Sequence, residues 1–176
     1  HGTSHFFQLV VPALFLFLIA DFDVSYTQLG SLMTTFFLVS GVGQPLAGFL
    51  VDRFGARSVL LLGLGIYCAA VFALALVPVF WAMFPLMCLA AIGNCVFHPA
   101  DFTVLNASVR PGFLGRAFGV HTLGGNLGWA LAPISMLLLA EVVGWRGALM
   151  GAAALGAAVW LMLWRYRHLL ADDVSV

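Results

Sequence analysis

Long apolar runs separated by short polar turns cover almost the whole chain. Each run is long enough to cross about 30 Å of hydrocarbon, which takes roughly 20 helical residues. The alternation of apolar and polar residues that is typical of membrane-barrel strands does not occur. The pattern therefore predicts six transmembrane helices, at residues 3–20, 27–50, 58–78, 81–106, 114–140 and 146–165.

The composition agrees with a membrane protein. Of the 176 residues, 63% are hydrophobic and only 8% are charged, and the mean hydropathy is +1.09. Seven arginines and seven acidic residues are too few to cover a soluble domain of this length with a polar surface. We expect residues 1–170 to form one all-α bundle in a lipid bilayer, with residues 171–176 as a cytoplasmic tail or the start of a central linker.

A charged turn interrupts the apolar pattern between the second and third predicted helices. Residues 48–57 read Gly-Phe-Leu-Val-Asp-Arg-Phe-Gly-Ala-Arg. Charge in the hydrocarbon centre is costly, so this turn is expected at a membrane surface. Six crossings place six of the seven arginines on that same side, and the positive-inside rule makes this side, and both chain ends, cytoplasmic. Those six are Arg53, Arg57, Arg110, Arg116, Arg165 and Arg167.

Polar side chains are unevenly distributed among the helices. The predicted helices at 58–78 and 146–165 are apolar nearly all round, and we expect them to face lipid. The other four carry polar groups and should line the interior. In the first helix His1, His5 and Gln8 have the spacing of one helical face, and in the fourth Asn94, His98 and Asp101 do so.

Asp101 is the strongest single candidate for a functional residue. It lies about 10 Å from Asn94 along the helix, still within the hydrocarbon, and so needs a partner, a proton or water. Two interpretations stay open. One is a proton or substrate-cation site with His98 as relay or ligand, and the other is a structural pair with Arg110, Arg116 or the 48–57 turn. The candidate proton or substrate site comprises His5, Gln8, Asn94, His98, Asp101 and His121.

Small residues mark one face of the predicted helix at 114–140. Small side chains let membrane helices approach closely, so we interpret this face as a packing surface. A phosphate cradle is disfavoured because no free helix N-terminus is expected at mid-membrane. His121 and Asn126 in the same helix lie about 140° apart and cannot both point one way. The proposed packing residues are Gly119, Gly124, Gly125, Gly128 and Pro133.

Enzyme and cofactor motifs are missing from the sequence. There is no His-Glu-x-x-His metalloprotease motif and no Gly-x-Ser-x-Gly nucleophile motif. The three cysteines fall in apolar runs without metal-ligand spacing. We therefore expect no enzyme activity, no cofactor and no metal site. A nucleic-acid partner is also not expected, because no basic stripe exists to neutralise phosphates.

The turn at 48–57 resembles the signature loop of the major facilitator superfamily, with the pattern G-x-L-x-D-R-x-G-x-R. The matching residues are Gly48, Leu50, Asp52, Arg53, Gly55 and Arg57. The resemblance covers the whole chain and implies the N-terminal half of that fold, with six helices arranged as two inverted three-helix repeats. It further implies that helices 1 and 4 line the cavity, that helices 2 and 5 contact the C-terminal half, and that helices 3 and 6 lie outside.

The same resemblance predicts a function. It implies a secondary transporter of a small molecule working by alternating access, in which Gly48, Asp52, Arg53, Gly55 and Arg57 form a conformational lock. The fifth helix partly resembles an antiporter motif, in which Gly119, Gly128 and Pro133 fit but Ala132 departs. The segments Phe97-His98-Pro99-Ala100 and Gly124-Gly125-Asn126 are similar to fosmidomycin-resistance-type members. Proton coupling and efflux are the resulting expectations, in a bacterial inner membrane.

Two questions stay open at this point. The family has about twelve helices, so this chain is either a fragment or a half-transporter that pairs with a second half-bundle. The alternative function is a non-transporting scaffold or assembly subunit built on the same fold. The polar residues at the predicted cavity favour the transporter.

Overall fold

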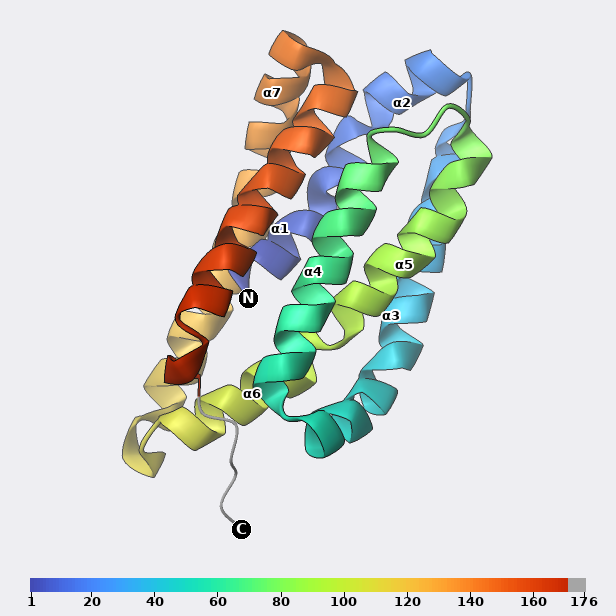
Figure 1. Cartoon of the computed structure of the whole chain (residues 1–176). Coiled ribbons are helices and arrows are strands. Elements are labelled where there is room, and N and C mark those ends of the chain that lie inside the picture. Colours follow the sequence, from blue (N-terminus) through green and yellow to red (C-terminus); the bar gives the residue numbers. More distant parts are fainter. Residues whose placement is uncertain (171–176) are drawn as a thin grey trace.

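The computed structural model describes residues 1–170 as an all-helical bundle (Figure 1), which confirms that the chain is all-α. The predicted tail at 171–176 lies outside the described residues. The helical elements in order are α1 (Gly2–Val10), η1 (Pro12–Leu14), α2 (Phe15–Phe22), α3 (Tyr26–Phe54), α4 (Ala56–Leu74), η2 (Phe80–Ala82), α5 (Met83–Cys95), α6 (Phe97–Ser108), η3 (Pro111–Phe113), α7 (Leu114–Arg165) and η4 (Arg167–Leu169).

Proline interrupts two of the predicted helices. The first is divided into α1 and α2 by a 3₁₀ turn that begins at Pro12. The fourth is divided into α5 and α6, with Val96 between them. Pro99 explains this second break, because it lacks an N–H and its ring clashes with the carbonyl four residues earlier, that of Cys95, where α5 ends. The two breaks lie next to α1 and α6, the helices that carry the polar residues.

The helix α3 begins and ends at residues with clear capping roles. Ser25 is the N-cap residue of this helix, and it forms a capping box. The Gln28 backbone N–H donates to Ser25 Oγ at 3.3 Å, while the Ser25 N–H donates to Gln28 Oε1 at 2.8 Å. At the other end a single residue, Gly55, connects α3 to α4 with φ +82°. This positive φ favours glycine, which explains one of the residues in the 48–57 turn.

The helix α7 reverses direction at Gly144, where φ is +73° and ψ is 166°. Its first arm, residues 114–143, and its second arm, residues 145–165, lie side by side (Figure 1). The sequence predicted a loop at 141–145, whereas the helix continues up to the reversal. Glycine supplies the entire turn, so no longer connection is needed.

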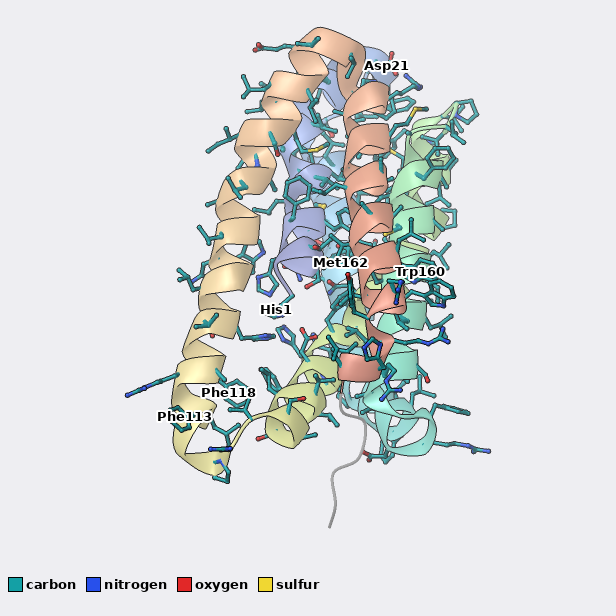
Figure 2. All side chains as sticks on the ribbon, turned by 60° about the vertical axis from the view of Figure 1, so that its left-hand side comes forward. His1, Asp21, Phe113, Phe118, Trp160 and Met162 are labelled. Carbon is teal, nitrogen blue, oxygen red and sulfur yellow. The ribbon has the colours of Figure 1, made fainter. Side chains whose placement is uncertain are left out.

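Arg146 fixes the second arm of α7 beside this reversal. Its guanidinium donates to Asp21 Oδ2 at 2.7 Å and to the Val77 carbonyl at 3.0 Å. The Trp145 indole N–H donates to the same Asp21 oxygen at 3.2 Å. Asp21 lies at the end of the bundle opposite the turn at Gly55 (Figures 1 and 2). The single arginine predicted for that face therefore joins the ends of three spans.

Within residues 1–170, five helical segments are long and apolar enough to cross a membrane: Gly2–Phe22, Tyr26–Phe54, Ala56–Leu74, Phe80–Ser108 and Pro111–Arg165. The third of these, α4, differs from the expectation that it faces lipid, since half of its span is buried. One side of α4 packs against α5 and α7, and the other exposes side chains such as Leu62 and Phe72. An apolar sequence does not distinguish contact with lipid from contact with a neighbouring helix.

Two glycines set the closest contact between α4 and α5. A Cβ added at Gly93 would lie 2.7 Å from the Gly63 carbonyl oxygen and 2.7 Å from the Tyr67 backbone nitrogen. The Tyr67 side chain is 1% exposed and its ring contacts those of Phe7 and Phe36. Any side chain at Gly93 would therefore force the two helices apart and loosen the core around Tyr67.

We predict that Gly93→Ala destabilises the bundle by about 1–3 kcal/mol, the usual cost of overpacking a close contact. Gly30→Ala is the matched control, because a Cβ at Gly30 meets no atom within 4 Å. Thermal denaturation of the purified chain in detergent, followed by circular dichroism, measures both. Equal melting temperatures for the two variants would contradict this account of the α4–α5 contact.

Candidate functional site

Four histidines and one aspartate gather in the interior of the bundle, from three segments distant in the sequence. His1 and His5 come from the start of the chain and α1, His98 and Asp101 from α6, and His121 from the first arm of α7. The His1 ring lies 4.3 Å from that of His5, 5.5 Å from that of His98 and 3.5 Å from that of His121, between centroids. We call these five residues the histidine cluster.

Asp101 is the only acidic member of the cluster and is 8% exposed. Its Oδ2 atom lies 2.9 Å from His1 Nδ1 and 3.8 Å from His121 Nε2. These two histidines are the ion-pair partners of Asp101 among the described residues. The sequence had left open a pair with an arginine instead. The break at Val96 sets the direction of α6 and so turns Asp101 toward α1.

Several nitrogens in the cluster have no hydrogen-bond partner among the described residues. Both ring nitrogens of His5 are buried in this way, and so are Nδ1 of His98 and Nε2 of His121. The His5 side chain as a whole is 7% exposed. Buried polar atoms without a partner carry a free-energy cost, so the cluster holds binding capacity that the protein itself does not use.

A second polar network lies next to the histidine cluster. The Trp129 indole N–H donates to Gln8 Oε1 at 2.9 Å, and Gln8 Nε2 donates to Asn94 Oδ1 at 3.3 Å. Asn94 Nδ2 in turn donates to Ser40 Oγ at 2.8 Å. The chain of bonds thus connects α7, α1, α5 and α3. The His5 ring, 4.3 Å from that of Trp129, joins it to the cluster.

The cluster borders a cavity of about 180 Å³. His1, Asp101 and His121 form its polar wall, and apolar side chains of α4 and of the second arm of α7 form much of the rest, including Leu60 and Leu163. Polar groups are therefore concentrated on one side of an otherwise apolar space. Such an arrangement is typical of a small-ligand site, in which a few polar groups fix orientation.

The turn at 48–57 lies at the end of the bundle where α3 meets α4 (Figure 1), and its last residue, Arg57, precedes the cavity-lining Leu60 by three positions. Asp52 and Arg53 are exposed in the last turn of α3. Arg57, in the first turn of α4, donates from Nε and a terminal nitrogen to the Leu170 carbonyl at 3.1 and 2.6 Å. A Cβ at Gly48 would meet no atom within 4 Å. The turn is therefore accessible at the surface of this chain.

The small residues of α7 differ in what they contact. A Cβ at Gly128 would collide with the Gly2 carbonyl, and one at Gly125 would lie 3.0 Å from the His1 ring and 3.1 Å from the His5 ring. A Cβ at Gly119 or Gly124 would meet nothing within 4 Å, and Pro133 is half-buried. The first two glycines therefore hold α1 close to α7 and bring its histidines into the cluster.

The sequence identified four of the five residues of the histidine cluster but missed His1, and it missed Ser40 and Trp129 of the second polar network. His1 shared a predicted face with His5, yet it was not selected as a site residue. Ser40 and Trp129 carried no signal, because a serine or a tryptophan in an apolar run has no distinctive spacing. Asn126, considered beside His121, is exposed and points elsewhere. Only the packing of four helices reveals which isolated polar residues meet.

Comparison with known proteins identifies the family. The profile of the Major Facilitator Superfamily matches residues 3–173. An uncharacterised transporter of this family from Bacillus subtilis, YfnC, is 28% identical over 166 residues, covering 93% of this chain and 40% of that protein. The probable L-galactonate transporter of Escherichia coli is 31% identical over 153 residues, covering 84% and 33%.

A third relative is the fosmidomycin resistance protein of Escherichia coli, which is 29% identical over 143 residues, covering 81% of this chain and 34% of that protein. The chain thus spans between 33% and 40% of the length of these relatives. The resemblance inferred from the 48–57 turn is confirmed. The chain belongs to the Major Facilitator Superfamily, whose members are membrane transporters, and is an integral multi-pass membrane protein.

Proposed function

We propose that this chain is one six-helix half of a secondary active transporter that moves a small molecule across the membrane by alternating access. The histidine cluster carries the proposal. A buried carboxylate and four imidazoles inside an apolar bundle are costly to keep, and polar residues at membrane depth usually mark a transport pathway. Two of the relatives are transporters by name and the third is a fosmidomycin resistance protein, and this chain spans 33–40% of their length.

The length of α7 supports the proposal of six crossings. A straight helix of its 52 residues would be about 78 Å long, more than twice the roughly 30 Å of a hydrocarbon core. The reversal at Gly144 divides it into two arms that each match one crossing. Added to the four preceding spans, they make six, which two inverted repeats of three would organise as in many transporters.

The arginine distribution supports an orientation. The α3–α4 turn, the α6–α7 connection and the end of α7 lie at the same end of the bundle (Figure 1) and carry Arg53, Arg57, Arg110, Arg116 and Arg165. The positive-inside rule assigns that end to the cytoplasm. Two relatives named above come from Escherichia coli and one from Bacillus subtilis, which supports a bacterial inner membrane.

The proposed partner of this half is the remainder of a twelve-helix transporter or a second half-bundle. Large apolar side chains are exposed along α3 and the first arm of α7, including Phe37, Phe49, Val120 and Leu131. These faces would contact the partner.

A scaffold that assembles other membrane proteins is the second candidate function, since the same exposed apolar faces could bind such proteins. The polar interior favours transport, because a scaffold has no use for a buried carboxylate.

The proposed substrate site is the histidine cluster together with Gln8 and Asn94, and we propose coupling to protons. Support comes from the contact between the Asp101 carboxylate and two imidazoles in a buried position. Efflux is supported by the likeness to a fosmidomycin resistance protein. The small residues Gly119, Gly124, Gly125, Gly128 and Pro133 form the proposed packing face of the same half.

We predict that Asp101→Asn lowers transport by the intact protein at least tenfold, because the only buried carboxylate of the cluster is lost. Fosmidomycin and L-galactonate are the probes, each measured as flux in vesicles under an imposed pH gradient. Glu141→Gln, an exposed acid near the opposite end, is the control and should transport as wild type. Flux of either probe that ignores a collapsed pH gradient would contradict proton coupling.

The lock formed by Gly48, Asp52, Arg53, Gly55 and Arg57 gives a separate prediction. Asp52→Asn removes a charge at the cytoplasmic end and should shift the inward–outward equilibrium, as for any two-state element. A cysteine placed at Leu105, which lines the cavity beside Asp101, reports this shift through its rate of alkylation from the cytoplasmic side.

We expect that rate to change severalfold in Asp52→Asn and to stay constant in the control Asp23→Asn, an exposed acid outside the turn. The native cysteines are replaced by serine in all these variants. Unchanged alkylation together with wild-type flux in Asp52→Asn would rule out a lock at this position.

A further inference from the structure

Three donor groups in the histidine cluster converge on one point. Among His1, Asp101 and His121, each offers one ligand atom, and these atoms all lie within 4.8 Å of one another. Figure 2 shows His1 beside the first arm of α7, which carries His121. Neither the 48–57 motif nor the family match assigns a role to this grouping, and the sequence predicted no metal site.

The distances suit a metal ion after small side-chain adjustments. Zn²⁺ binds imidazole nitrogen and carboxylate oxygen at about 2.0–2.2 Å, which in a tetrahedron places neighbouring ligand atoms roughly 3.4 Å apart. The observed separations of 2.9 Å from His1 to Asp101 and 3.8 Å from His121 to Asp101 lie on either side of that value. Since the three ligand atoms lie within 4.8 Å of one another, side-chain rotations would be needed to centre an ion.

The cluster also offers further ligands to complete the coordination. His5 is only 7% exposed, and neither of its ring nitrogens has a hydrogen-bond partner in the described part of the chain. His98 has one such nitrogen, Nδ1, and its ring lies 5.5 Å from that of His1. These atoms are donors without a protein partner. A cation would pair with the one unprotonated nitrogen of each imidazole that it reaches, whereas the contact between His1 and Asp101 leaves these nitrogens unpaired.

Charge and donor type select the kind of ion. Imidazole nitrogens with a single carboxylate suit first-row transition metals, whereas Ca²⁺ and Mg²⁺ prefer all-oxygen sites. The cluster has one anionic group, and its nearest described ion-pair partners are histidines that can be neutral. A divalent cation would therefore be held by both charge and coordination.

We propose that His1, Asp101 and His121 bind a divalent transition-metal ion of the Zn²⁺ or Co²⁺ type, with His5 or His98 as a further ligand. The negative charge of Asp101 offsets the free-energy cost of burying the ion, and the imidazoles replace the hydration shell of the ion. The inference concerns equilibrium binding to this chain. Metal binding is tested independently of the transport activity proposed above, so either proposal can fail without the other.

The experiment measures Co²⁺ and Zn²⁺ binding to the purified chain in detergent, with no affinity tag because histidine tags bind both ions. Isothermal titration gives the dissociation constant for Zn²⁺, and visible absorption of Co²⁺ reports its coordination. We expect one ion per chain. His121→Ala and Asp101→Asn should each weaken binding at least tenfold, while His168→Ala, which changes an exposed histidine outside the cluster, should not alter it.

A second variant separates loss of a ligand from loss of the fold. His121→Cys keeps a metal ligand at the same position, so it should retain Co²⁺ and add an intense thiolate-to-cobalt charge-transfer band. Circular dichroism checks that all variants remain helical. Wild-type affinity in both His121→Ala and Asp101→Asn, or an equal loss in His168→Ala, would overturn the proposal, as would His121→Cys that binds without the new band.

Discussion

The burial of the Asp101 carboxylate is the constraint on which the interior of this bundle depends. An ionised carboxylate in an apolar membrane interior is unstable unless it is paired. Asp101 is paired through histidines from two other helical segments, with His1 at 2.9 Å and His121 at 3.8 Å. The interaction therefore determines how closely α1, α6 and the first arm of α7 must approach.

Glycines make that approach possible. Gly125 lies beneath the rings of His1 and His5, and a Cβ there would come within 3.0–3.1 Å of both. Gly128 lies against the backbone of α1 at Gly2. The packing face and the polar site are thus one arrangement, because the same close contact that joins α1 to α7 places two imidazoles beside Asp101. A larger side chain at either glycine would displace the histidines as well as the helix.

The sequence was sufficient for the parts of the structure that depend on local pattern. Apolar runs indicated where the helices lie. Effects of individual residues on the path of the chain were harder to predict. Pro99 was expected to loosen a helix, yet it divides α5 from α6, and Gly144 replaces a loop by a one-residue reversal. Partners such as Ser40 for Asn94 and Trp129 for Gln8 depend on helix packing, which no spacing in the sequence encodes.

The two polar networks are mechanically connected, and this connection bears on how the site would respond to movement. Trp129 donates to Gln8, and its ring also contacts that of His5 in a tilted arrangement, with ring centroids 4.3 Å apart. Gln8 leads on to Asn94 in α5, while His5 leads to His1 and Asp101. A shift of the first arm of α7 along α1 must therefore break the Trp129–Gln8 bond or carry His5 with it. Because His121 lies on the same arm, such a shift would also alter the surroundings of Asp101, so the position of α7 and the state of the carboxylate are coupled through direct contacts.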